Sequence, residues 1–548
     1  MNFSSLRFYD NLKAGDGMKK ILIVILTSFV IFISGCSNEK DNSIYLDDNY
    51  RNYYEIFVGS FYDSNNDGIG DIKGVIEKLD YLNAGDKKTD NDLGVDGIWL
   101  MPIMASPTYH KYDIKDYYSI DPQYGTMEDF QELIDKCNKR NIKLIIDLVL
   151  NHTSSEHPWF VSAKRSLAIE PCGQEECVYE ELCREHNKYV NYYNFSNEKL
   201  SGYHSYKMPE GWYYEGVFWD QMPDLNLDNE EVWNEIESIL KFWIEKGIDG
   251  FRLDAVTSYY TGNITKNVEA LRKIDLLAQK YKDDIYIVGE AWADSGTIES
   301  YYESGINSFF NFPYGDSNGV ISNTIRNKDG FSFSQKLEKW QSSLKKVNKD
   351  FIDATFLSNH DMGRSAGFLM RDLQKEKMAA SLYLMIPGNS FIYYGEEVGM
   401  TGSGVDENKR LPMVWSVNNK EGTTNSPTGA TISNSIEAGV LEQNEDKNSL
   451  LNFYKKILSI KKENPEIARG DINAIDIGND SICAYSCDYN GSKVYIVHNL
   501  LEEDLSIDFS KEKYKYKKIV GSLETDDGKV KLKEDVLTLP AMSTAIIK

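Results

Sequence analysis

The segment that most constrains the fold is residues 250–256, an apolar run that contains Arg252 and Asp254. Side chains two positions apart on a β-strand point to the same face, so this pair would lie together on a buried strand. Removing a charged pair from water costs several kcal/mol, which is tolerated where a cavity, a partner or chemistry compensates. Taken alone, the segment is equally compatible with a structural ion pair and with a functional site.

Three further apolar runs also end in polar residues: 144–150 before Asn151 and His152, 285–289 before Glu290, and 354–358 before Asn359, His360 and Asp361. Apolar runs that alternate with helical segments predict a parallel sheet buried on both faces. In a (β/α)8 barrel the chemistry lies at the carboxyl ends of the strands. The sequence therefore predicts an α/β fold, a (β/α)8 TIM barrel, with Asp254, Glu290 and Asp361 at one end.

The chain divides into a barrel with two additions. The expected barrel strands are 54–58, 97–103, 144–150, 250–256, 285–289, 308–312, 354–358 and 391–397, which assign residues 51–152 and 221–465 to the barrel. Residues 153–220 have no clear period and are too long for an ordinary connection, so we expect an inserted subdomain beside the cleft. Short alternating runs and turn residues in 466–548 predict a C-terminal antiparallel β-sandwich.

The first fifty residues have the pattern of an export signal. Lys19 and Lys20 precede the apolar residues 21–33, a run too short for a comfortable membrane span of ~20 residues. Cys36 follows Ile-Ser-Gly and resembles the lipobox of bacterial lipoproteins. We therefore expect a signal peptide over 1–36, with 1–17 as an upstream extension, a tether over 37–50, and export with anchoring to the cell membrane through lipidated Cys36. An uncleaved anchor would leave the protein on the same face of the membrane.

The charge of the chain restricts its partners. A formal net charge of −25 argues against nucleic acid, because phosphate binding requires clustered Lys and Arg. A neutral or small substrate is favoured instead. Aromatic residues make up 12% of the chain, which suits stacking on sugar rings but equally suits an ordinary core.

Residues 63–71 match the pattern of a Ca²⁺ loop. Oxygen-bearing side chains stand at Asp63, Asn65, Asp67 and Asp71, and Ile69 offers a backbone carbonyl. The twelfth position is glycine instead of glutamate and the loop follows a strand, so it is not an EF-hand. A polar turn without metal is the alternative. We expect a structural Ca²⁺ here.

Three cysteines, Cys172, Cys177 and Cys183, crowd the expected insertion. In an exported protein one disulfide among them is possible, although three cysteines cannot all pair together. His186 is the only candidate histidine for a zinc site in this segment, and we expect no zinc site there.

Four segments together indicate a family: 147–152 (DLVLNH), 250–254 (GFRLD), 289–292 (GEAW) and 358–361 (SNHD). In order and spacing they resemble the four sequence regions of the α-amylase family, glycoside hydrolase family 13. The resemblance implies that Asp254 is the nucleophile, Glu290 the general acid/base and Asp361 the stabiliser of the transition state. It further implies that Arg252, His152 and His360 bind the reacting sugar and that Tyr112 stacks beneath it.

Physical chemistry agrees with these implied roles. Retaining glycosidases use two carboxyl groups about 5–5.5 Å apart, one as nucleophile and one as proton donor. Arg252 on the same face as Asp254 favours the ionised form of that carboxyl group. Glu290 must keep its proton near neutral pH, which a dry or negatively charged setting favours. We expect retention of the α-configuration.

Two local patterns narrow the expected specificity. Residues 221–226 (QMPDLN) are similar to a stretch intermediate between oligo-1,6-glucosidase-like and neopullulanase-like members, and the Ca²⁺ loop also resembles oligo-1,6-glucosidases. Tyr109 stands where exo-acting relatives place an Asp that closes the pocket. Tyr109 and His110 look like the open cleft of endo-acting α-amylases, although Lys111 departs from the usual Gly. We expect cleavage of internal α-1,4 bonds of starch or maltodextrin by a monomer.

Other functions remain open from the sequence. An exo-acting α-glucosidase or oligo-1,6-glucosidase would release glucose from the first turnover. A 4-α-glucanotransferase would exclude water and lengthen maltotriose. A sugar-binding lipoprotein would have lost its carboxylates, and the presence of all three argues against that alternative.

Overall fold

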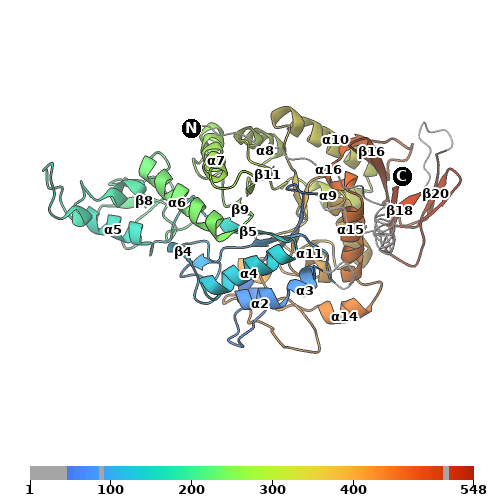
Figure 1. Cartoon of the computed structure of the whole chain (residues 1–548), viewed down its shortest axis with the longest axis horizontal. Coiled ribbons are helices and arrows are strands. Elements are labelled where there is room, and N and C mark those ends of the chain that lie inside the picture. The colour runs from blue at the N-terminus through green and yellow to red at the C-terminus, as the bar shows by residue number, and fades with distance from the viewer. Residues whose placement is uncertain (1–45, 86–91, 510–517) are drawn as a thin grey trace, which may run out of the picture. The chain divides into compact units, whose positions relative to one another are not determined.

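The computed structural model of the protein describes residues 46–85, 92–509 and 518–548 (Figure 1). The expected signal peptide, its apolar residues 21–33, Cys36 and the first part of the tether lie outside these ranges. Among the described residues, none of the helices combines the length and the apolar character needed to cross a membrane.

A closed parallel sheet forms the centre of the molecule. Its strands are β1 (Asn52–Ile56), β2 (Gly97–Leu100), β5 (Lys143–Leu148), β9 (Gly250–Leu253), β10 (Tyr286–Gly289), β11 (Ser308–Phe309), β12 (Ala354–Phe356) and β13 (Asn389–Tyr393). They follow the order β11-β10-β9-β5-β2-β1-β13-β12, and every pair is parallel. The Asn311 N–H donates to the Ala354 carbonyl at 2.8 Å and links the two outer strands. The predicted (β/α)8 barrel is confirmed.

Helices lie outside the strands, with α2, α3 and α4 on one side and α7, α8 and α10 on the other in Figure 1. Besides α3 (Leu79–Leu82), a single turn, the helices have these bounds: α2 (Ile72–Glu77), α4 (Met127–Lys139), α6 (Glu230–Lys246), α7 (Ile264–Gln279), α8 (Ser295–Tyr301), α9 (Val320–Asn327), α10 (Gly330–Val347), α12 (Leu373–Leu384), α14 (Val440–Glu445) and α15 (Leu450–Glu463). Shorter helices are α11 (Ser365–Phe368), α13 (Asp406–Lys409) and α16 (Glu466–Arg469).

Local sequence explains where these helices begin and end. Thr126 and Asp129 form a reciprocal capping box that satisfies free N–H groups at the start of α4. Asn229 caps α6, and Gly247, with φ of 103°, ends that helix in the left-handed region where glycine has no steric cost. These caps fix where each helix begins or ends relative to the strand that follows it.

The strands are shorter than the apolar runs that predict them. Within the run at 308–312 the strand spans only Ser308–Phe309, followed by a single bridge from Phe310 to Ala354, and within the run at 97–103 it spans only Gly97–Leu100. Residues such as Met101 and Ile103 stay buried beyond the strand end. An apolar run in the sequence indicates that residues are buried, not that they pair in a sheet. The predicted strands therefore include buried loop residues that follow the paired ones.

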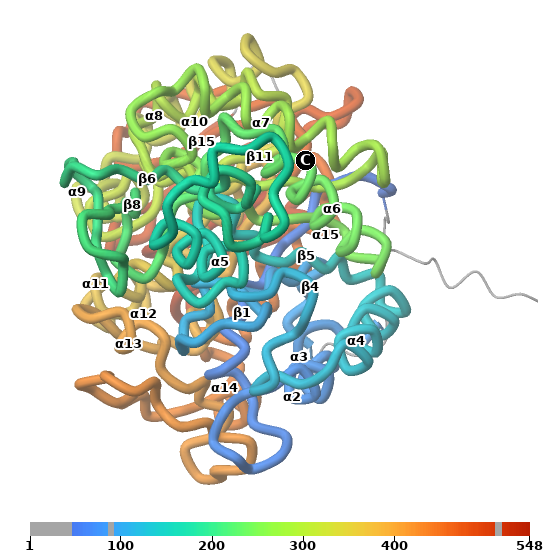
Figure 2. Tube along the Cα trace, turned by 90° about the vertical axis from the view of Figure 1, so that its left-hand side faces the viewer, coloured from blue at the N-terminus to red at the C-terminus, as the bar shows by residue number. Residues whose placement is uncertain are grey.

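Residues 153–220 leave the barrel after β5 and return before α6; Figure 2 shows them in teal and green toward the viewer. They contain α5 (Pro158–Leu167), the 3-10 turns η2 (Glu180–Leu182) and η3 (Lys188–Tyr192), and the sheet β6 (Phe195–Ser196), β8 (Tyr213–Glu215) and β7 (Tyr203–His204). The Thr153 N–H donates to the Pro223 carbonyl at 3.1 Å, and the Leu225 N–H donates to the Asn151 carbonyl at 2.8 Å. Both ends of the insertion are therefore pinned beside the end of β5. A separate hairpin, β3 (Met104–Ala105) and β4 (Asp116–Ile120), precedes it.

The C-terminal region consists of two antiparallel sheets. One has the order β14 (Asp471–Ala474), β15 (Ile482–Tyr489), β16 (Ser492–Asn499), β21 (Thr544–Ile547) and β18 (Ile519–Leu523); the other is β17 (Leu505–Asp508), β20 (Val536–Leu539) and β19 (Lys531–Lys533). Apolar side chains from both sheets share one core, including Val497, Leu537 and Ile547. The predicted C-terminal antiparallel domain is confirmed.

Candidate active site

Strand register brings the first two expected catalytic residues side by side. Gly289 on β10 pairs with Leu253 on β9, so Glu290 and Asp254 each follow the paired residue on neighbouring parallel strands. The Glu290 N–H also donates to the Leu253 carbonyl at 2.9 Å. Because parallel strands end at the same edge, both carboxyl groups lie at the carboxyl end of the barrel.

A single buried guanidinium, that of Arg252, joins three carboxyl groups. Its Nη1 lies 2.9 Å from Asp147 Oδ1 and 2.5 Å from Asp254 Oδ1, and its Nη2 lies 3.0 Å from Glu290 Oε1. Arg252 is only 1% exposed, whereas Asp254 and Glu290 are each 8% exposed. The two carboxyl groups thus share one cation and keep limited access to solvent.

The Glu290 carboxyl group is protonated at neutral pH. Burial raises its pKa to about 8; Arg252 opposes this shift, while the negative charges of Asp254 and Asp361 add to it. The Ala255 N–H donates to Glu290 Oε2 at 2.9 Å and fixes the carboxyl group in place. A protonated carboxyl group beside a second carboxyl group is the arrangement that general acid catalysis can use.

Asp361 lies between two cations. Its Oδ2 is 2.9 Å from His360 Nε2 and its Oδ1 is 2.7 Å from Arg410 Nη2. Burial would raise the pKa of Asp361, but His360 and Arg410 hold it well below its usual range. Asp361 is therefore ionised at neutral pH, the state needed to stabilise positive charge on a sugar ring.

The imidazole of His360 bridges Asp361 and a second carboxylate. Its Nδ1 lies 2.5 Å from Glu55 Oε1 on β1. Burial would lower the pKa of His360, but Asp361 and Glu55 raise it to about 10. His360 is consequently an imidazolium at neutral pH, and both of its nitrogens carry protons.

Tyr112 lies against this imidazolium. Its ring stacks on His360 with 5.5 Å between centroids and 13° between planes. The Tyr112 hydroxyl donates to Asp147 Oδ2 at 3.0 Å and lies 2.7 Å from His360 Nε2. These contacts lock the ring orientation, as a sugar-stacking platform requires.

His152 is buried and neutral. Burial lowers the pKa of its imidazole, and its Nε2 lies 3.2 Å from the Tyr112 carbonyl oxygen. The preceding Asn151 donates its side-chain amide to Asp224 Oδ1 at 3.0 Å. His152 therefore holds the backbone of Tyr112 while lying at the edge of the same site.

Tyr109 and His110 lie on the loop before Tyr112. The Tyr109 hydroxyl accepts from Arg410 Nη1 at 3.2 Å. His110 Nδ1 accepts from the Tyr112 N–H at 3.1 Å, and burial, with Arg410 and His152 adding to it, lowers the pKa of His110 to about 4. Lys111, where Gly is usual, adopts φ of 65°, and its ammonium lies 3.0 Å from Asp121. This buried ion pair offsets part of the backbone strain.

Three residues of the site were not predicted: Asp147, Glu55 and Arg410. Asp147 and Glu55 are acidic residues inside apolar strands, which is the same signal that singled out Asp254. Arg410 stands just after α13, in a polar region without periodicity, so only the folded chain brings its guanidinium to Asp361.

The expected Ca²⁺ loop has a compact fold. Asp63 accepts the N–H groups of Asn66 and Gly68, each at 2.7 Å, and Gly68 adopts φ of 91°. The Asp71 carboxylate accepts from the Gly74 N–H at 2.7 Å and so caps α2. The donors at Asp63, Asn65, Asp67, Ile69 and Asp71 are all oxygens, the type that Ca²⁺ prefers, so the loop fits this ion chemically. Calcium binding here stays a prediction.

Comparison with known proteins agrees with this geometry. The family model for the α-amylase catalytic domain matches residues 55–470, and that for the C-terminal domain of the α-amylase SusG matches residues 482–546. The chain is 40% identical to "Alpha-amylase 3" of Dictyoglomus thermophilum, with 90% of this chain and 91% of that protein covered. It is 30% identical to an oligo-1,6-glucosidase of Bacillus cereus, with 82% and 90% covered.

A solved structure, Eubacterium rectale Amy13B, superposes with a TM-score of 0.85 at 41% identity, covering 92% of this chain and 96% of that one. The catalytic family model spans most of the chain and includes all four motifs. The chain therefore belongs to the α-amylase family, glycoside hydrolase family 13.

Proposed function

We propose that this α-amylase family hydrolase cleaves internal α-1,4-glucosidic bonds of starch and maltodextrins with retention of configuration. The observation that carries the proposal is the pair of carboxyl groups on one guanidinium, with Glu290 protonated and Asp254 bound to Arg252. This pairing supplies a proton donor and a nucleophile within reach of one glycosidic bond.

In the first step, Glu290 transfers its proton to the glycosidic oxygen while an Asp254 carboxylate oxygen attacks the anomeric carbon. The carbon–oxygen bond to the leaving sugar breaks, and a covalent glycosyl ester forms on Asp254. In the second step, Glu290 takes a proton from water, whose oxygen displaces Asp254 from the opposite face. Two inversions leave the α-configuration.

Other residues of the site stabilise the positively charged transition state. The Asp361 carboxylate stays ionised and faces the site between His360 and Arg410. A negative charge held close to an oxocarbenium-like sugar lowers the barrier without forming a bond. Tyr112 supplies an apolar ring face for the same sugar, oriented by His360.

An endo-acting mode is favoured by the loop before Tyr112. Tyr109 carries no charge there, and its hydroxyl accepts from Arg410 instead of offering a carboxylate to a terminal glucose. The relative named as an α-amylase is also more similar than the one named as an oligo-1,6-glucosidase. We therefore infer that the cleft passes a glucan chain through.

The second candidate function is an exo-acting oligo-1,6-glucosidase or α-glucosidase. Its support is the 30% identity to a protein of that name over most of both chains. Such an enzyme would bind a chain end and release glucose from the first turnover.

Calcium and the membrane anchor complete the proposal. Ca²⁺ would be held by Asp63, Asn65, Asp67, Asp71 and the Ile69 carbonyl, and it would supply a structural cross-link of the loop.

Export with lipidation at Cys36 is supported by the residues before it, and labelling with a radioactive fatty acid would test this against Cys36→Ser. A monomer is the proposed assembly.

The deciding experiment is a product time course from soluble starch and maltoheptaose. Endo-cleavage predicts mixed oligosaccharides and a rapid fall in viscosity before glucose accumulates. Glucose alone from the earliest times would establish the exo-acting alternative. Proton NMR of the first product tests retention, and a β-anomer there would refute the mechanism.

A further inference from the structure

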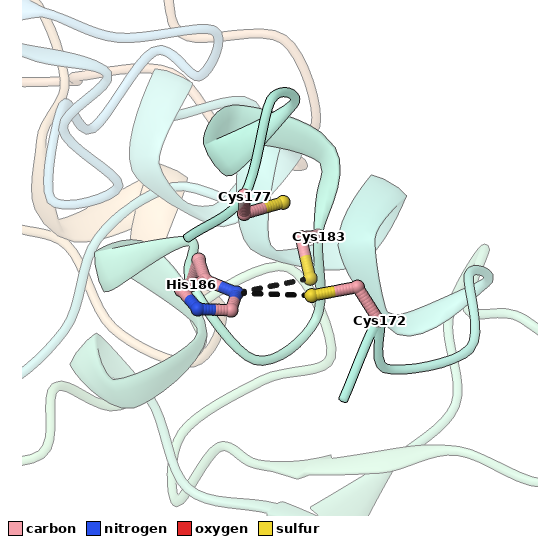
Figure 3. Close-up of side chains that lie close together, drawn as sticks. All are labelled: Cys172, Cys177, Cys183 and His186. Atoms are coloured by element: carbon pink, nitrogen blue, oxygen red, sulfur yellow. Dashed lines mark hydrogen bonds between the residues drawn. The ribbon is translucent and has the colours of Figure 1, made fainter. Parts of the chain in front are cut away.

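The inserted segment brings together four side chains of types that can bind a metal: Cys172, Cys177, Cys183 and His186 (Figure 3). The three sulfur atoms and one imidazole nitrogen all lie within 4.8 Å of one another. The Cys172 and Cys183 sulfurs lie 3.5 and 3.4 Å from His186 Nδ1. In the portion of the chain that the structure describes, this is the one group of three or more His, Cys, Asp or Glu side chains whose ligand atoms converge in this way.

The two sulfur-to-nitrogen distances match a tetrahedral zinc site, and the remaining ligand atoms lie within 4.8 Å, close enough to converge on one ion. With Zn–S of about 2.3 Å and Zn–N of about 2.0–2.1 Å, the ligand atoms of a tetrahedron lie roughly 3.5–3.8 Å apart. A disulfide would bring two sulfurs to about 2.05 Å, and Cys172, Cys177 and Cys183 are all free thiols in this structure. The arrangement is therefore that of separate ligand atoms gathered within 4.8 Å, not that of a bonded pair.

Backbone contacts build the cluster from two arms of one loop. The N–H groups of His186 and Asn187 both donate to the Cys183 carbonyl, at 3.3 and 2.9 Å, so Cys183 and His186 project from a single turn. The Glu185 carboxylate accepts the Gly173 N–H at 2.9 Å and draws the Cys172 arm onto that turn. The sequence favoured no zinc site here, but the fold adds Cys172, 14 residues before His186, to the Cys183–His186 turn.

The surroundings show what a metal would do there. The segment between α5 and η3 contains little regular structure, and Val178 and Tyr179 are 89% and 72% exposed. The C-terminal end of this segment is attached to α5 through Asn187, whose side-chain amide donates to Ser166 Oγ at 2.8 Å. Residues 168–182 are exposed except for the half-buried Cys177, and such a loop gains order from a cross-link, as small metal-bound modules do.

We propose that Cys172, Cys177, Cys183 and His186 bind one structural Zn²⁺ that cross-links the inserted subdomain. Three thiolates and one imidazole fill all four tetrahedral positions, so no position remains for substrate, and the site is structural instead of catalytic. The ligands lose their thiol protons to solvent when the metal binds. The proposal does not depend on which glucan the barrel cleaves.

The test begins with the metal content of the purified full-length protein. We expect about one equivalent of zinc by inductively coupled plasma mass spectrometry, retained after gel filtration. Replacement by Co²⁺ should give the thiolate charge-transfer and ligand-field absorption of a tetrahedral cobalt site. Cys177→Ser and Cys183→Ser should lose the zinc and these bands, whereas Cys137→Ala, which alters a buried thiol on α4, should keep both.

A second readout follows the loop directly. Removing zinc with a chelator should increase proteolytic cleavage within residues 168–187 of the wild type several-fold and leave the Cys183→Ser variant, already sensitive, unchanged. Equal cleavage with and without chelator would overturn the cross-linking role. Three results would each overturn the site. The protein could contain no zinc while all three thiols react with an alkylating agent, mass spectrometry could find a disulfide in this segment, or iron could be bound in place of zinc. Thermal unfolding of each variant shows whether the barrel remains folded.

Discussion

Two groups of buried carboxyl groups lie at the same end of the barrel but have different partners. In the charged cluster, consisting of Asp147, Arg252, Asp254, Glu290, His360, Asp361 and Arg410, carboxyl groups contact guanidinium or imidazolium. In the tyrosine-capped pair, Glu396 and Glu397 after β13, hydroxyl groups replace the cations. Glu396 Oε1 accepts from Tyr383 and Tyr454 at 2.6 and 3.0 Å, and Glu397 Oε1 accepts from Tyr54 and Tyr81, both at 2.6 Å.

This difference separates a reactive carboxyl group from a structural one. Burial raises the pKa of Glu396 to about 7, close to the value of about 8 for Glu290, so the pKa alone does not identify the catalytic residue. Glu396 and Glu397 are 3% and 0% exposed, whereas Glu290 retains 8% exposure beside Asp254. Solvent access next to a second carboxyl group on the same guanidinium distinguishes the active group.

The largest expected effect comes from Glu290→Gln. The amide keeps the shape and the contact with the Ala255 N–H but cannot donate a proton at the right acidity, so kcat/KM on starch should fall by about 10²- to 10⁴-fold. Initial rates of reducing-sugar release measure this. Glu396→Gln is the matched control, and equal losses in both variants would abolish the distinction between the two groups.

The pH profile of the wild type should show the Glu290 proton. Because the pKa of Glu290 is raised to about 8 and its protonated form is the active one, kcat/KM falls as the pH rises through 8, about tenfold per unit beyond it. The fluoride of α-maltosyl fluoride leaves without being protonated. The kcat/KM profile measured with this substrate should therefore lack the alkaline limb. An identical limb with both substrates would assign it to another residue.

Arg410→Lys should weaken catalysis to a smaller degree. Lysine keeps the charge but cannot span the Asp361 carboxylate, the Tyr109 hydroxyl and the His360 carbonyl together, so kcat should fall about tenfold, or ~1.4 kcal/mol. Steady-state kinetics on maltoheptaose measure the loss. Arg469→Lys, which alters an ion pair with Asp48 away from the barrel's carboxyl end, should leave kcat unchanged, and a similar loss there would make the effect non-specific.

Glu396→Gln should show the smallest effect on activity and a clear effect on stability. Its amide N–H₂ would face the hydroxyl donors that the carboxyl group now accepts, which lowers the free energy of unfolding by about 1–3 kcal/mol. Denaturant unfolding followed by fluorescence measures this, with kcat/KM staying within about twofold. A large loss of activity without loss of stability would place Glu396 in the catalytic machinery.

Much of the barrel could be predicted because buried apolar runs alternate with helical segments and four of the runs carry or precede polar residues, as at Asp254 and Glu290. Strand ends could not be placed, since Met101 and Ile103 are as buried as paired residues. Asp147 and Glu55, which we did not predict as site residues, are acidic residues within apolar runs and could have been found by the same criterion as Asp254. Arg410 carried no such signal, because its approach to Asp361 depends on loop contacts. The three cysteines and His186 were visible as candidates, but only the fold shows that their ligand atoms converge.

The amino-acid sequence alone determined the order of strands and helices and the residue types available for chemistry, since burial and helix capping act over short stretches of chain. Only the tertiary structure decided that one guanidinium joins Asp147, Asp254 and Glu290, because that contact depends on the register between β5, β9 and β10. The pKa values of carboxyl groups on separate strands shift only after folding has brought the groups together and removed water from between them.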